Sequence, residues 1–203
     1  MLPKLNKVHY RCLLTAGLLA LVTLLPAQTE KGMLVIGGSA NISESIQGTS
    51  NTFNLALQPT FGAFVIKNFA VSGSYSFSVG SSRTYNAKTG IYTTTTTFNT
   101  SVGPLLKYYI GKKTMKPFVS ANAGYSVFTQ IRSNTSPGNT ASLANYDGFS
   151  VGGSAGLAYF LNPHLSLESA LYITSSGYKT QLPTTRFGFS LGLYAFLDKK
   201  KPE

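Results

Sequence analysis

The ionisable side chains of this chain are few, and their positions limit the chemistry that they can do. Among 203 residues only 6 are acidic, and no two of them share one of the alternating segments described below. The sequence therefore predicts no pair of carboxylates for acid–base or metal chemistry. His164 is the only histidine beyond residue 27, and its place after Asn162-Pro163 is typical of a turn. Serine is too plentiful to exclude a lone nucleophile, but this inventory predicts a protein that is not an enzyme and that needs no metal or cofactor.

One pair of oppositely charged residues, Lys107 and Glu168, could still interact with each other. Both stand where the alternating pattern of their segments has its polar residues. Lys107 lies four residues before Gly111, and Glu168 lies four residues after His164. Gly111 and His164 both belong to short connectors, so Lys107 and Glu168 are expected at similar depths in the fold. We weigh two hypotheses for them: the charges form a buried salt bridge, or each contacts water and nearby hydroxyl groups.

The runs that hold these residues follow a two-residue alternation. In FAVSGSYSFSV (residues 69–79) the odd-numbered positions are mostly large and apolar, whereas the even-numbered positions are alanine and serine. Side chains on a β-strand point alternately to opposite faces, so the run predicts a strand with one apolar and one polar face. Eight segments follow this pattern: Met33–Ile42, Phe53–Val65, Phe69–Val79, Thr94–Ile110, Phe118–Ile131, Phe149–Leu161, Leu165–Ile173 and Thr185–Leu197.

The connectors between the eight segments alternate in length. This alternation predicts an up-and-down antiparallel meander with short turns at one end and longer loops at the other. The short connectors are Ile66–Asn68, Gly111–Pro117 and Asn162–His164. The long connectors, which are rich in Ser, Thr, Asn and Gly, are Ser43–Thr52, Gly80–Thr93, Arg132–Gly148 and Thr174–Thr184.

The composition of the two faces indicates which one points outward. Charged residues make up 11% of the chain, against roughly 25% in a typical soluble domain. The polar face consists mainly of small uncharged residues, which fit the narrow interior of an eight-stranded barrel. The apolar face carries no charge, as lipid requires, because Lys or Arg at the midplane costs roughly 2–4 kcal/mol. We therefore predict an all-β fold, a closed eight-stranded antiparallel transmembrane β-barrel with its serines inside. The alternative is an exported soluble barrel or sandwich, such as a lipocalin-like carrier.

The first 27 residues have the pattern of a secretory signal peptide. Lys4, Lys7 and Arg11 precede an apolar run of about 14 residues, shorter than the ~20 that a transmembrane helix needs. We predict cleavage after Ala27, and a retained N-terminal anchor is the alternative. Cys12, the only cysteine, lies in this segment, so the mature chain is expected to have no thiol.

The predicted mature chain has three parts: a lead of residues 28–32, the barrel of residues 33–197 and a basic periplasmic tail of residues 198–203. It retains 14 basic and 6 acidic residues, a formal charge of +8. In an exported chain this charge fits anionic lipid headgroups better than nucleic acid.

The meander, the hairpin GPLLKYYIGKKTMKPFVSANAGYS (Gly103–Ser126) and the closing FGFSLGLYAFL (Phe187–Leu197) carry a family resemblance. With them the chain resembles the small eight-stranded outer-membrane β-barrels of diderm bacteria, the group typified by OmpA and OmpX. The closing segment looks like the signal by which assembly machinery recognises such barrels. It departs from that pattern because the chain continues beyond it as Asp198–Glu203. The candidate signal residues, which share one face, are Phe189, Leu191, Leu193 and Leu197.

The resemblance implies a place in the outer membrane, with both chain ends periplasmic and the long loops external. Its implied partners are outer-membrane lipids, lipopolysaccharide and the barrel assembly machinery; it names no extracellular partner. The expected role is non-catalytic, structural or in surface interaction, with a plugged lumen. The alternatives are a narrow channel and a lipid-modifying enzyme, which some relatives are. Lys107 and Glu168 are then expected across the lumen near its periplasmic end. The expected inward aromatic residues are Phe64, Tyr109, Phe118, Phe128, Phe160, Tyr172, Tyr194 and Phe196.

Overall fold

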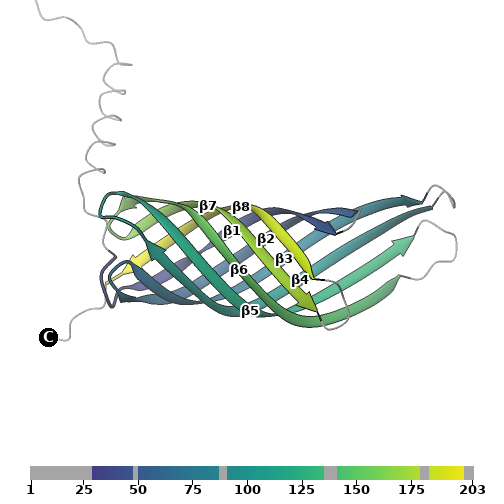
Figure 1. The fold of residues 1–203 in the computed structure, drawn as a ribbon, viewed down its shortest axis with the longest axis horizontal. Helices are drawn as coiled ribbons and strands as arrows, with labels where there is room; N and C mark the ends of the chain where they lie inside the picture. Colours follow the sequence, from purple (N-terminus) through teal and green to yellow (C-terminus); the bar gives the residue numbers. More distant parts are fainter. Residues whose placement is uncertain (1–28, 48–49, 87–90, 135–140, 179–182, 199–203) are drawn as a thin grey trace, which may run out of the picture.

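The computed structural model is a closed β-barrel, and it describes residues 29–47, 50–86, 91–134, 141–178 and 183–198 (Figure 1). Eight strands follow one another around the barrel, each antiparallel to its neighbours, and the last pairs with the first. The predicted fold class is therefore confirmed. The strands are β1 (Leu34–Gln47), β2 (Ser50–Ile66), β3 (Phe69–Asn86), β4 (Ile91–Tyr109), β5 (Met115–Asn134), β6 (Ser142–Asn162), β7 (Leu165–Tyr178) and β8 (Thr184–Leu197).

The two ends of the barrel differ, and we name them the turn end and the loop end. Short turns join β2 to β3, β4 to β5 and β6 to β7 at the turn end, where β1 also begins and β8 ends. Asn68 and Gly111 have φ angles of 64° and 94° in two of these turns. Asparagine and glycine are the residues that most readily adopt this left-handed conformation. The loop end is the opposite one, at which β1 ends and β8 begins.

At the loop end the strands run further than the sequence predicted. β3 continues from Val79 to Asn86, and β4 starts at Ile91 within the predicted connector Gly80–Thr93. The prediction ended the third segment at Val79, its last large apolar residue before the polar connector. Backbone pairing does not need large apolar residues, because threonine and other β-branched side chains favour extended strands on their own. Figure 1 shows β3 to β6 projecting beyond the other strands at this end.

The alternation divides the side chains between lumen and outer surface as predicted. Ser72, Ser74 and Ser78 of β3 are buried inside, whereas Tyr75 and Phe77 of the same strand are exposed outside. The same split holds on the other strands, where exposed Leu, Ile, Val and Phe side chains form an apolar belt around the barrel. A soluble carrier would bury these apolar side chains and expose the serines. The structure has the opposite arrangement, which argues against the soluble carrier. Within the described residues, no helix is long and apolar enough to cross a membrane.

Candidate functional site

An aromatic cluster occupies the lumen near the turn end. Tyr109, Phe160 and Phe196 have less than 2% of their surface exposed, and their ring centroids lie 5.3 to 6.3 Å apart. Phe64 and Phe118 pack on the same Tyr109 ring, at 5.8 and 5.9 Å. These are inward residues of β2, β4, β5, β6 and β8, so the cluster joins side chains from five of the eight strands. We call these five residues, together with Tyr194, the aromatic plug.

The structure brings Lys107 and Glu168 together on top of the aromatic plug. Lys107 Nζ donates to Glu168 Oε2 at 2.6 Å, and both side chains are almost fully buried. Glu168 Oε1 accepts a hydrogen bond from the Tyr109 hydroxyl at 2.6 Å and a longer one from Ser166 at 3.4 Å. Both carboxylate oxygens therefore have donors, and this compensates the carboxylate for its removal from water.

The ammonium group of Lys107 also lies over aromatic rings. Its Nζ is 3.8 Å from the centroid of Tyr194 and 4.9 Å from that of Phe118. A cation over a ring face is attracted by the ring quadrupole, most strongly where water is excluded. A Cβ atom on Gly37 or Gly192 would approach the Tyr194 ring to 2.7 Å, so glycine at these positions lets the ring lie against the wall. The plug thus combines apolar packing with one compensated ion pair.

Residues of the predicted lead cover the turn end below the plug. Thr29 is buried, accepts a hydrogen bond from Lys116 Nζ at 2.8 Å and donates one to the Asn68 side chain. Glu30 forms an exposed salt bridge with Lys67 at 2.5 Å. The sequence placed Lys116 in a turn and assigned the lead no contacts; the structure places Lys116 in β5 with 1% of its surface exposed. A lysine after a run of turn residues carries no pattern that predicts burial.

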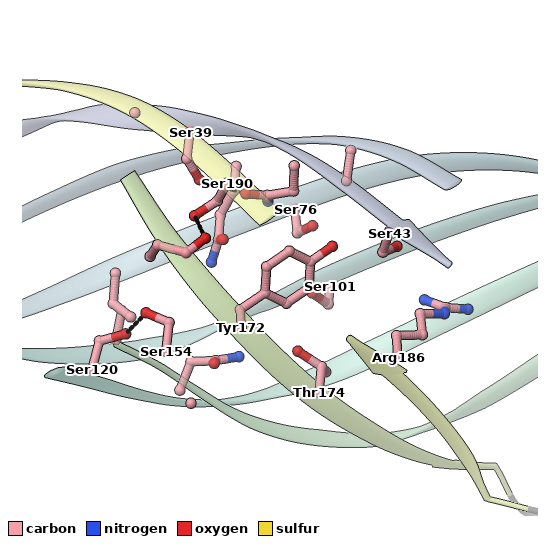
Figure 2. Close-up of a pocket in the computed structure, with 18 of the residues that line it drawn as sticks. Ser39, Ser43, Ser76, Ser101, Ser120, Ser154, Tyr172, Thr174, Arg186 and Ser190 are labelled. Atoms are coloured by element: carbon pink, nitrogen blue, oxygen red, sulfur yellow. Dashed lines mark hydrogen bonds between the residues drawn. The ribbon is translucent and has the colours of Figure 1, made fainter. Parts of the chain in front are cut away.

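Between the plug and the loop end the lumen contains a polar cavity of about 120 Å³ (Figure 2). Serine hydroxyls on neighbouring strands bond to each other along its wall, as Ser120 does with Ser154 at 2.7 Å. Ser150, which also lines the cavity, accepts a hydrogen bond from the buried Ser126 at 2.9 Å. Such pairs satisfy polar groups without charge. The charged residues lining the cavity are Lys107, Glu168 and Arg186.

Arg186 is a luminal residue that sequence reasoning missed. It is the second residue of the predicted segment Thr185–Leu197, but no luminal place was predicted for it; the structure places it in β8 on the cavity wall. The alternation of β8 could have predicted this luminal position. Arg186 is even-numbered, as are the inward-facing Ser190 and Gly192, which also line the cavity. It lies so close to the predicted start of the strand that the alternation could not assign it firmly.

The other candidate residues lie outside the lumen. Phe189, Leu191, Leu193 and Leu197 are exposed on the outer face of β8, where they form part of the apolar belt. His164 occupies the turn between β6 and β7, with its ring Nδ1 3.0 Å from the carbonyl oxygen of Phe196. Among the described residues, no group of three or more His, Cys, Asp or Glu side chains is arranged to hold a metal ion.

Comparison with solved structures places this fold among known proteins. Neisserial surface protein A matches with a TM-score of 0.61 and 13% identity, over 80% of this chain and 96% of that one. Ail, the attachment invasion locus protein of Yersinia pestis, matches at 0.51 and 13%, over 82% and 99%. OprG of Pseudomonas aeruginosa, an outer membrane protein, matches at 0.50 and 13%, over 85% and 99%.

The fold is that of the small outer-membrane β-barrels. This agrees with the family resemblance of the sequence and with the apolar belt on the outer surface. At 13% identity the similarity shows the fold alone. No family model and no curated protein sequence matches the chain.

Proposed function

We propose that this protein is an outer-membrane barrel with a closed lumen and a non-catalytic role in envelope structure or surface interaction. The observation that carries the proposal is the aromatic plug with the Lys107–Glu168 pair buried on it. A plugged barrel has no continuous water path for ions. Its function must therefore depend on its outer surface and its loop end. The name of Ail, an attachment protein of the same fold, supports a surface role.

The proposal includes an orientation and an assembly route. The turn end, where β1 begins and β8 ends, faces the periplasm, and the loop end faces outward. The reason is that small outer-membrane barrels have short periplasmic turns. The exposed apolar residues Phe189, Leu191, Leu193 and Leu197 are the proposed signal for the assembly machinery. The apolar belt contacts the lipids, and lipopolysaccharide surrounds the loop end.

The test is the ion conductance of the mature chain, residues 28–203, refolded and inserted in a planar bilayer. We expect no discrete current steps, because the plug blocks the lumen. Replacing the buried pair with small uncharged residues, as Lys107→Ser with Glu168→Ser, is expected to produce a measurable leak. The control is the same change in the exposed pair, Glu30→Ser with Lys67→Ser.

One outcome would argue against a closed lumen, and a second would argue against the role of the ion pair in closing it. Stable current steps from the unaltered protein would make it a narrow channel, with Lys107 and Glu168 at its gate. A double variant of the buried pair that inserts and stays silent would show that the pair does not contribute to the seal. Insertion is verified in each case by protection of the barrel from added protease.

A further inference from the structure

The cavity above the plug is lined by a positive charge that forms no salt bridge with the described side chains. Of the three charged residues that line it, Lys107 and Glu168 are bound to each other. Arg186 forms no salt bridge in the described part of the chain, and its Nε–H is shielded from water without a hydrogen-bond acceptor. Among the described side chains that line the cavity, Arg186 is therefore the one charge without a charged partner.

The described residues around Arg186 include three hydroxyl-bearing side chains. Thr174 is its cross-strand neighbour on β7, and Tyr172 and Ser43 lie close by on the same wall (Figure 2). Glu168 is six residues before Thr174 on β7, or about 20 Å along the strand, and so is too far to neutralise the guanidinium. Hydroxyl groups donate as well as accept hydrogen bonds, so they can contact an anion together with arginine.

We propose that Arg186 is the centre of a luminal binding site for a small oxyanion such as phosphate. A guanidinium presents two parallel N–H donors that match the oxygens of phosphate or carboxylate. The hydroxyls of Ser43, Tyr172 and Thr174 supply further donors around it. A cavity of about 120 Å³ has room for a small ion with a few water molecules. The bound anion balances the charge of the arginine and gives it an acceptor.

The site does not depend on whether the barrel conducts ions. It lies above the plug, so a silent barrel and a leaking one present the same cavity to an ion. Its failure is therefore distinguishable from failure of the proposed closed lumen.

The test follows the side-chain Nε–H signal of Arg186 by NMR, with the refolded mature protein in a maltoside detergent that contains no phosphate. Sodium phosphate is added at pH 7 and compared with sodium chloride at the same ionic strength. We expect phosphate to shift this signal and the backbone amide of Thr174 with saturation. Arg186→Gln is expected to weaken phosphate binding about tenfold or more, since it removes a charge-assisted pair of hydrogen bonds.

Two control variants make the test specific. Arg132→Gln removes an exposed arginine of β5 and is expected to leave phosphate binding unchanged. Glu44→Gln changes the β1 residue adjacent to Ser45, the cross-strand neighbour of Arg186, and is also expected to have no effect. Backbone amide spectra establish that each variant keeps the barrel fold.

Three results would overturn the proposal. The first is an identical response to chloride, which would show general screening of charge. The second is a phosphate shift that persists in Arg186→Gln, which would place the ion elsewhere. The third is a tenfold gain in affinity in Glu44→Gln, which would show that a carboxylate already partners Arg186.

Discussion

At the scale of single residues, Lys107 and Glu168 depend on each other for their place in the lumen. Taking two charges out of water is costly, and attraction repays the cost only where the remaining donors and acceptors are satisfied. Here Tyr109 supplies a second donor to the carboxylate, and the Tyr194 ring faces the ammonium group. Each charge is thus tolerable only while the other is present.

Removing one member of the pair is therefore expected to destabilise the barrel more than removing both. Lys107→Met leaves a buried carboxylate and is expected to cost about 3–5 kcal/mol of unfolding free energy. Lys107→Met with Glu168→Gln is expected to recover most of that loss. The measurement is urea-induced unfolding from lipid vesicles, followed by tyrosine fluorescence.

The exposed Glu30–Lys67 pair is the matched control. Lys67→Met removes the same kind of contact where both side chains are more than half exposed, so its expected cost is about 0–1 kcal/mol. If the double variant of the buried pair lost as much stability as the two single variants combined, the charges would be acting independently. The hypothesis that each contacts water and hydroxyls would then be favoured.

Sequence reasoning at this scale succeeded where alternation and turn spacing combined. Lys107 and Glu168 have clear parity and equal distances from short turns, and the structure brings them into contact. Arg186 was missed because it lies near a strand end, where the alternation has too few apolar neighbours to establish parity. The burial of Lys116 depends on Thr29, which is 87 residues away. Such a contact leaves no local pattern in the sequence.

At the scale of the strand, the outer face of β8 determines how the barrel fits a bilayer. Leu191 lies near the middle of β8, and Thr185 lies on the same outward parity close to the loop end; both are exposed. The cost of a charge on the lipid face depends on its depth. Two arginine variants on one strand can therefore measure where the hydrocarbon layer lies.

We expect Leu191→Arg to lower the stability of the barrel in lipid vesicles by about 2–4 kcal/mol and Thr185→Arg by about 0–1 kcal/mol. The measurement is urea unfolding of each variant refolded in vesicles without assembly machinery. Equal costs at the two positions would contradict a belt centred on the middle of β8.

The ends of the strands were less predictable than their number or their faces. A period of two residues marks a strand only where the two faces differ in chemistry. In β3 that contrast is strong up to Val79, whereas Ser81-Ser82 gives hydroxyls on both faces. Pairing nevertheless continues there, because β4 offers a threonine-rich partner in register. The extent of a strand beyond the membrane is thus a property of two strands together.

At the scale of the whole molecule, closure between β1 and β8 decides the stability of the barrel. The register runs without interruption from Leu34 opposite Leu197 to Ile46 opposite Thr185. In a bilayer an open seam would leave backbone groups without hydrogen bonds, at several kcal/mol each. The membrane-embedded part is therefore expected to open as one cooperative unit, with no weak seam.

Amide hydrogen exchange in lipid bilayers tests this closure. Amides along the β1–β8 seam, such as those near Ile42 and Phe189, are expected to be as strongly protected as those of the β4–β5 pair. The projecting parts of β3 beyond Ser81 and of β6 before Gly148 have a strand partner on one side only. There every second amide is expected to exchange at least about 100-fold faster, because it lacks a hydrogen-bond acceptor. Rapid exchange along the seam itself would instead indicate an open sheet, which lipid does not tolerate.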